Sequence, residues 1–222
     1  MHHSSAAALL PNLDAVPQQM IDRWRADAPT TEQARITRFQ SANRVRQYIA
    51  GRQLLRSLLR HQQGIDPIIE TEESGAPRIA GSNLFCSISH SGSAVLVAYS
   101  QTGRIGVDIE MLRERDYLKL VEHYFHASEI SAFNKLPESA RQQWFYERWV
   151  RKEAHAKASG EGITLRGLRK QLTEESRLVR LGIPGYAAAI MHRGTGQPTL
   201  LAGCVCGEGK LRFSFLSGAK QG

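Results

Sequence analysis

Two short motifs carry side chains that are suited to holding a metal ion. The first, Gly-Val-Asp-Ile-Glu, places Asp108 and Glu110 two residues apart in a β-forming run, so both carboxylates share one face of the strand. The second is an expected helix over 149–157, which puts Glu153 and Lys157 one turn apart on one side. Three carboxylates and one ammonium group in a common cleft would hold a divalent cation against a pyrophosphate.

Each of these motifs also has an ordinary structural explanation when it is taken alone. Two acidic residues on a strand often form a solvated face that discourages aggregation at a sheet edge. A glutamate and a lysine four residues apart often form a weak ion pair on a helix surface. The neighbouring residues favour the functional interpretation, because Gly106 permits close approach of a ligand or another backbone. The aromatic residues at 144–149 would fix the orientation of the helix.

Residues 87–92, Ser-Ile-Ser-His-Ser-Gly, form a third motif at the point where an expected strand enters a glycine turn. The hydroxyl of Ser89, the imidazole of His90 and free backbone N–H groups there would bind a phosphate. A hydroxyl-rich turn with an exposed histidine is the alternative. Arginines recur at 35–60, and they form either a solvated helix face or a set that grips an anionic ligand.

The overall charge favours anionic partners. Among the 222 residues, 29 Lys and Arg outnumber 21 Asp and Glu, which gives a net charge of +8 at pH 7. Such a charge steers nucleic acid, an acidic protein, a phosphorylated cofactor or a membrane surface toward the protein without choosing among them. The sequence has neither an apolar run of about 18 residues nor a signal-peptide pattern, so we expect a cytoplasmic protein with no membrane association.

Elements are expected in the order helices, strands, helices, strands, which predicts an α+β fold with two halves. We predict an N-terminal α+β lobe over 1–103 and a C-terminal α+β lobe over 104–222 that carries the acidic motif. Residues 1–8 resemble a remnant of an expression tag and are given no element. Helices are expected at 17–28, 41–61, 117–125, 128–136 and 138–159, and strands at 68–71, 78–80, 85–89, 94–99, 104–111, 176–181, 186–192, 199–206 and 210–216.

Taken in order, these motifs resemble those of the 4′-phosphopantetheinyl transferase superfamily, in its two-lobed Sfp-type branch. Residues 85–92 are similar to its N-I-S-H-S-G element, with Ser87 in place of the usual asparagine. Residues 106–110 match its G-[IV]-D-[IVL]-E motif, and 149–157 match its W-x-x-K-E-[AS]-x-x-K motif. The likeness spans about residues 35–165, and several ordered elements make chance agreement improbable.

The resemblance implies a fold and a reaction. The fold would be two similar lobes with pseudo-twofold symmetry, each an antiparallel sheet packed with helices, with coenzyme A in the crevice of a monomer. The reaction would transfer 4′-phosphopantetheine from coenzyme A to a serine of an apo acyl or peptidyl carrier protein and release adenosine 3′,5′-bisphosphate. It would depend on Mg²⁺, with Mn²⁺ as an alternative. Carrier proteins are acidic, which complements the net charge of +8.

The resemblance also implies roles for particular residues. The catalytic residues would be Asp108, Glu153 and Lys157, and the metal ligands Asp108, Glu110 and Glu153. Glu153 would also be the general base for the serine, directly or through water. A metal-bound carboxylate is a poor base, so these two roles of Glu153 compete, and Glu129 is the reserve candidate. Residues that contact coenzyme A would be Arg35, Arg38, Arg46, Ser89, His90, Asp108 and Lys157, the three arginines neutralising its 3′-phosphate.

The sequence departs from the family pattern at one position and leaves two other functions open. Ala76 stands where the family often has a lysine near the nucleotide, and Arg78 is a possible substitute. The first strand of the N-terminal lobe is expected to be missing or abbreviated. A basic nucleic-acid-binding module and a relative that binds coenzyme A without turnover are the alternatives. The sequence does not distinguish fatty-acid, polyketide and nonribosomal-peptide carriers.

Overall fold

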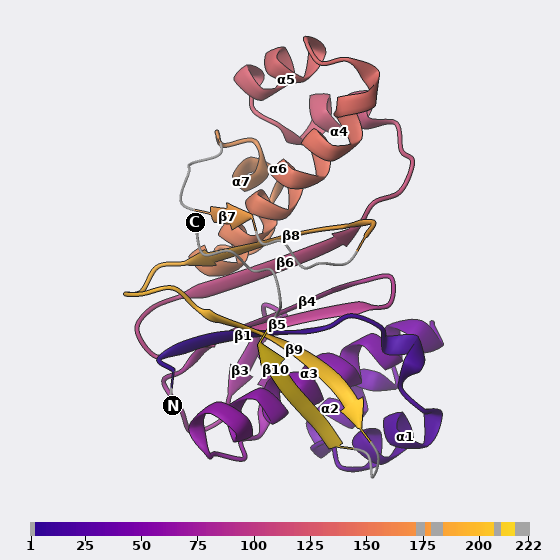
Figure 1. The fold of residues 1–222 in the computed structure, drawn as a ribbon, viewed down its shortest axis with the longest axis vertical. Helices are drawn as coiled ribbons and strands as arrows, with labels where there is room; N and C mark the ends of the chain where they lie inside the picture. Colours follow the sequence, from indigo (N-terminus) through magenta and orange to yellow (C-terminus); the bar gives the residue numbers. More distant parts are fainter. Residues whose placement is uncertain (1–2, 172–175, 179–183, 207–209, 216–222) are drawn as a thin grey trace.

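The structure, a computed structural model, describes residues 3–171, 176–178, 184–206 and 210–215. The fold is α+β, as predicted, and its layers are stacked in the order helices, sheet, sheet, helices (Figure 1). Two predicted strands are only partly covered, because residues 179–181 of the strand at 176–181 and residue 216 of the strand at 210–216 lie outside the described residues. None of the helices in the described ranges has the length and apolar character needed to cross a membrane. The internal pseudo-twofold relation stays a prediction.

The elements follow the predicted order closely. The first part of the chain forms β1 (Ser5–Leu10), the 3₁₀ turn η1 (Leu13–Ala15), α1 (Gln18–Ala26), α2 (Thr30–Ile36), α3 (Ala42–Gln63), β2 (Ile69–Thr71), β3 (Pro77–Ile79), β4 (Phe85–Ser91) and β5 (Ala94–Ser100). The second part forms β6 (Ile105–Met111), α4 (Tyr117–Tyr124), α5 (Ala127–Asn134), α6 (Glu138–Ser159), α7 (Leu165–Leu168), β7 (Ser176–Leu178), β8 (Tyr186–His192), β9 (Thr199–Cys206) and β10 (Lys210–Phe215).

Two sheets face each other across the middle of the molecule. The larger has the strand order β10-β9-β1-β5-β4 and the smaller β6-β8-β7, while β2 and β3 form a separate hairpin. In the described part of the chain, β1 and β9 pair in parallel and the other strand pairs are antiparallel. Alternate residues of β1 and β5, such as Leu9 and Leu96, pack against Val107 and Ile109 of β6 between the two sheets. Strand β4 is therefore the edge of one sheet and β6 the edge of the other.

The N-terminal residues form a central strand, so setting aside residues 1–8 was wrong. Strand β1 lies between β5 and β9, and all six of its residues are buried. Ala7 and Leu9 face the space between the sheets, whereas Ala6 and Ala8 face the helical side. The strand has few of the β-branched residues that usually signal a strand, and it is stabilised by partners far away in the sequence. The first strand, which was expected to be missing or abbreviated, is present and has six residues.

The predicted boundary between residues 103 and 104 does not separate the two sheets. Strands β9 and β10 come from the C-terminal part of the chain, but they extend the sheet that β1, β4 and β5 form (Figure 1). The parallel pairing of β1 with β9 runs from Ala6 opposite Thr199 to Leu9 opposite Ala202. The C-terminal end of the chain thus stabilises the sheet of the N-terminal lobe, and the assignment of 1–103 and 104–222 as lobes stays a prediction.

Two long helices cover the outer faces of the sheets. Helix α3 packs through Leu54, Leu55 and Leu58 on the larger sheet. Helix α6 packs through Val150 and Ala154 on the smaller one, beside α4 and α5. Both helices end at a glycine in the left-handed conformation, Gly64 and Gly160, as the sequence pattern indicates.

Candidate functional site

Gly106 brings helix α6 unusually close to strand β6. A Cβ atom at this position would lie 2.1 Å from the carbonyl oxygen of Ala154 and 2.6 Å from the backbone N of Ala158. Only glycine therefore lets the helix backbone lie directly on the strand. The sequence predicted that either a ligand or another backbone comes close to Gly106, and in the structure it is the backbone of α6. It places the helical turn that carries Glu153 and Lys157 over the acidic face of β6.

Substitution of Gly106 by alanine should therefore destabilise the protein. The added methyl meets backbone atoms, so α6 must shift away from β6, and overpacking of this kind costs roughly 1–3 kcal/mol. We expect Gly106→Ala to lower the free energy of unfolding by about 2 kcal/mol in urea titrations. Gly167→Ala, whose Cβ would come no closer than 3.1 Å to the Thr164 hydroxyl, is the control and should cost less. Equal stability of the two variants would contradict the close-approach argument.

Asp108, Glu110 and Glu153 converge at the contact between β6 and α6. Each carboxylate offers an oxygen that lies within 4.8 Å of those of the other two. Asp108 is only 1% exposed, and Glu110 and Glu153 are half-buried. Burial, together with the charge of Asp108, raises the pKa of Glu153 to about 8. Burial likewise raises the pKa of Glu110, although a hydrogen bond from Ser91 opposes the shift. Without a cation, burial and the charge of Asp108 therefore disfavour the negative charge on both Glu110 and Glu153.

Lys157 lies against this acidic cluster. Its Nζ is 2.6 Å from Asp108 Oδ1, 3.1 Å from the hydroxyl of Ser89 and 4.0 Å from Glu153 Oε2. Burial disfavours the charged form of this lysine, but the neighbouring carboxylates outweigh burial and raise its pKa. Its side chain keeps 23% of its surface exposed. Lys157 thus offsets the negative charge of Asp108.

The cluster fits a hard divalent cation. Carboxylate oxygens are the ligands that Mg²⁺ and Mn²⁺ prefer. Asp108 Oδ2 is buried, and among the described residues no hydrogen-bond partner reaches it. An unpaired buried carboxylate oxygen is costly unless it coordinates a cation or is protonated. The structure therefore supplies both the ligand types and an unsatisfied ligand atom for a metal ion.

Ser89 and His90 point to opposite faces of β4, as neighbouring residues of a strand do. The hydroxyl of Ser89 donates to Asp108 Oδ1 at 2.7 Å and belongs to the acidic cluster. The imidazole of His90 faces helix α3, where its Nε2 lies 2.7 Å from a guanidinium nitrogen of Arg44. Burial, aided by the charge of Arg44, lowers the pKa of His90 to about 4, so the ring is neutral and accepts this hydrogen bond.

Arg44 and Arg46 of α3 have different partners, and only Arg44 of the two contacts His90. The guanidinium of Arg46 donates to the carbonyl oxygens of Leu13 and Val16, at 3.2 and 2.9 Å, and to Gln18. These bonds hold the turn after β1 against α3, so the assignment of Arg46 to coenzyme A is not supported by its contacts. Arg44 is one of the arginines at 35–60 that the sequence offered for an anionic ligand, but the helix pattern does not show which of them faces β4.

The other predicted basic residues lie around the N-terminal lobe. A Cβ atom added at Gly75 would lie 3.7 Å from the guanidinium of Arg35, which is near the end of α2. Arg35 therefore lies beside the turn of the β2–β3 hairpin. Arg38 follows α2 and is exposed. Arg78 forms an ion pair with Glu70 across the β2–β3 pair, so it is not a free replacement for a lysine at position 76.

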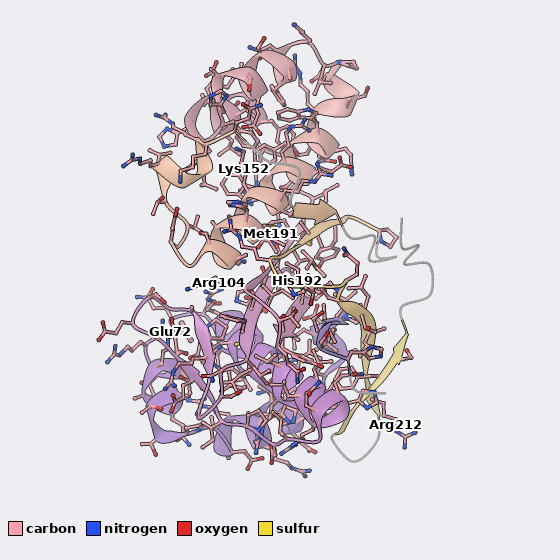
Figure 2. All side chains as sticks on the ribbon, turned by 90° about the vertical axis from the view of Figure 1, so that its left-hand side faces the viewer. Glu72, Arg104, Lys152, Met191, His192 and Arg212 are labelled. Carbon is pink, nitrogen blue, oxygen red and sulfur yellow. The ribbon has the colours of Figure 1, made fainter. Side chains whose placement is uncertain are left out.

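Glu129 does not face the acidic cluster. It forms a buried ion pair with Lys152, in which Glu129 Oε2 and Lys152 Nζ are 2.7 Å apart. Lys152 also donates to the carbonyl oxygens of Leu168 and Lys170, at 2.8 and 2.7 Å. In Figure 2, Lys152 lies above Met191 and His192 of β8, on the side of the smaller sheet where α6 packs. Glu129 therefore stabilises the packing of α5 and α6, and its contacts do not support the role of reserve base.

Comparison with known proteins places the acidic cluster in a matched region. A family model of the 4′-phosphopantetheinyl transferase superfamily matches residues 104–181. The chain is 34% identical to the 4′-phosphopantetheinyl transferase HetI of Nostoc sp. over 155 residues, which are 66% of this chain and 65% of HetI. It is 27% identical to the transferase psf-1 of Bacillus pumilus over 82% of this chain and 80% of psf-1. It is 32% identical to the transferase AcpT of Escherichia coli over 47% of this chain and 55% of AcpT.

Proposed function

Because the chain belongs to the 4′-phosphopantetheinyl transferase superfamily, we propose that it transfers the 4′-phosphopantetheine group of coenzyme A to a serine of an apo acyl or peptidyl carrier protein. Adenosine 3′,5′-bisphosphate would be the other product. The observation that carries this proposal is the convergence of three carboxylates and Lys157 at the contact of β6 and α6, within the matched residues 104–181. The expectations of a cytoplasmic location and a monomer stay predictions.

Asp108, Glu110 and Glu153 are the residues that would hold the metal ion, Mg²⁺ or Mn²⁺. When bound, the cation would stabilise the negative charge that develops on the pyrophosphate. Asp108 is the most constrained of the three, because Ser89 and Lys157 both donate to its Oδ1 and leave Oδ2 for coordination. The serine hydroxyl on β4 and the lysine on α6 thus fix the carboxylate on β6.

The remaining residues of the site would move a proton and orient the phosphate. The carrier serine oxygen attacks the phosphorus next to pantetheine, and the bond from that phosphorus to the bridging oxygen breaks. We assign the proton of the serine to Glu153 through a water molecule, since a carboxylate that also faces a cation is a poor direct base. Lys157 would hold a pyrophosphate oxygen, because its side chain is partly exposed beside the cluster.

Arg44 and His90 would contact a phosphate of coenzyme A at the α3 side of β4. The exposed guanidinium of Arg44 is oriented by the neutral imidazole of His90. Charge-assisted hydrogen bonds to such a group contribute about 1.5–3 kcal/mol. We therefore expect Arg44→Ala to raise the KM for coenzyme A by about tenfold, with kcat little changed, in steady-state assays of carrier modification.

Arg46→Ala is the matched control for this prediction, because Arg46 lies two residues away on the same helix. Its guanidinium donates hydrogen bonds to the backbone carbonyls of Leu13 and Val16. This variant should lose stability in urea titrations and keep the wild-type KM for coenzyme A. An unchanged KM in Arg44→Ala, or an equal increase in Arg46→Ala, would rule out the assignment of Arg44.

The proposed reaction is tested by incubating the protein with coenzyme A, Mg²⁺ and a panel of apo carrier proteins from fatty-acid, polyketide and peptide synthesis. Intact mass spectrometry should show one added phosphopantetheine on at least one carrier. Carriers with the acceptor serine replaced by alanine, and reactions with a chelator, should show none. Binding of coenzyme A without any transfer would instead identify a non-catalytic relative, and tight salt-dependent binding of nucleic acid would support a nucleic-acid-binding module.

A further inference from the structure

Three serines of β4 connect the edges of the two sheets. Ser87, Ser89 and Ser91 alternate along the strand and therefore share the face that points toward β6. Their hydroxyl oxygens accept hydrogen bonds from the backbone N–H groups of β6, at 3.0 Å from Val107, 3.4 Å from Ile109 and 3.1 Å from Met111. In this row of bonds, side-chain hydroxyls take the place of the backbone carbonyls of a neighbouring strand.

The register of this row sets the acidic motif against the serines. The three N–H groups belong to alternate residues of β6, whose other edge pairs with β8. Asp108 and Glu110 lie between these residues, so each carboxylate is next to one serine. Ser89 donates a hydrogen bond to Asp108 Oδ1 and Ser91 donates one to Glu110 Oε2, both at 2.7 Å. Ser87 completes the row but has no carboxylate opposite it.

We propose that Ser91 is a positioning residue that orients the carboxylate of Glu110 toward the metal ion. This inference rests on the proposed function, because it takes the cluster of Asp108, Glu110 and Glu153 as the metal site. Ser91 has its hydroxyl oxygen fixed by the N–H of Met111, so the direction of its O–H bond is restricted. The bond to Glu110 Oε2 then restricts rotation of the carboxylate and leaves Oε1 for the cation.

Such a restriction matters for Glu110 more than for Asp108. Asp108 is buried and receives hydrogen bonds from both Ser89 and Lys157. Glu110 has a longer side chain and is only half-buried near the end of β6. A flexible carboxylate loses conformational entropy when it coordinates a cation, and a fixed donor reduces that loss. Ser91 therefore preorganises a metal ligand that has more freedom than Asp108.

Direct Mn²⁺ binding to the protein alone tests this role, by electron paramagnetic resonance or calorimetry without coenzyme A or carrier. Ser91→Ala should weaken Mn²⁺ binding by about tenfold, since loss of a group that supports a metal ligand lowers affinity by roughly 10- to 100-fold. Ser87→Ala is the matched control, because it removes the same kind of bond to β6 without touching a carboxylate. It should leave Mn²⁺ affinity unchanged, and urea titrations should show a similar loss of stability in both variants.

A double-mutant cycle decides whether Ser91 acts through Glu110. In the Glu110→Ala background, Ser91→Ala should cause no further loss of Mn²⁺ affinity. Wild-type affinity in Ser91→Ala, equal weakening in Ser87→Ala, or additive losses in the cycle would each overturn the proposal. The protein could bind Mn²⁺ in a Ser91-dependent way and still fail to modify any carrier. This result would refute the proposed reaction and leave the positioning role of Ser91 standing.

Discussion

Asp108→Asn is expected to reduce phosphopantetheine transfer by about a thousandfold. A bound cation supplies several kcal/mol of charge stabilisation, and each 1.36 kcal/mol corresponds to about a factor of ten in rate. Asparagine keeps an oxygen that can accept from Ser89 and Lys157, so the fold should be preserved while the buried negative charge is lost. The measurement is the rate of carrier modification at saturating coenzyme A over a range of Mg²⁺ concentrations.

Asp66→Asn is the matched control for this prediction. Asp66 also accepts hydrogen bonds from two side chains, Arg56 at 2.5 Å and Arg60 at 2.6 Å, and these bonds lower its pKa to about 2. It follows α3 at the surface, away from the strand that carries Asp108. The control should transfer at the wild-type rate. A rate in Asp108→Asn near that of wild type, with the same Mg²⁺ dependence, would refute the metal role.

The convergence of the acidic side chains was predictable because it depends on local rules. Strand alternation puts Asp108 and Glu110 on one face, and helical spacing puts Glu153 and Lys157 on one side. Gly106 permits the two elements to meet without an intervening side chain. The structure brings these four residues together as the motifs predict. Their catalytic roles are not tested by this geometry and stay proposals.

The parts that were not predictable depend on contacts between distant segments. Strand β1 is rich in alanine, and only its pairing with β5 and β9 makes it a strand. Arg44 and Arg46 differ by about 200° around a helix of 3.6 residues per turn, so one faces β4 and the other faces the turn after β1. The sequence alone gives no reference for that rotation. The serine row at 87–91 was visible in the sequence as alternate hydroxyls, but its partner strand was not.

Lys152→Met is expected to lower the free energy of unfolding by about 3 kcal/mol or more, the largest stability loss predicted for this protein. Removal of one partner of a buried ion pair costs roughly 3–5 kcal/mol, because the remaining charge stays buried without its counterion. Lys152 and Glu129 keep only 3% and 7% of their side-chain surface exposed. The same substitution also deprives the carbonyl oxygens of Leu168 and Lys170 of their donor. Urea titration of the two proteins measures the difference.

A second substitution separates the cost of the unpaired charge from the cost of the lost carbonyl donor. Glu129→Gln removes the buried charge but keeps an oxygen that can accept from the backbone N–H of His126. Added to Lys152→Met, it should recover part of the lost stability, and the remainder would measure the two unsatisfied carbonyls. Lys119→Met is the control, because its ion pair with Asp116 is exposed and contributes little. A double variant no more stable than Lys152→Met would show that Lys152 acts through the backbone of 168–170 and not through Glu129.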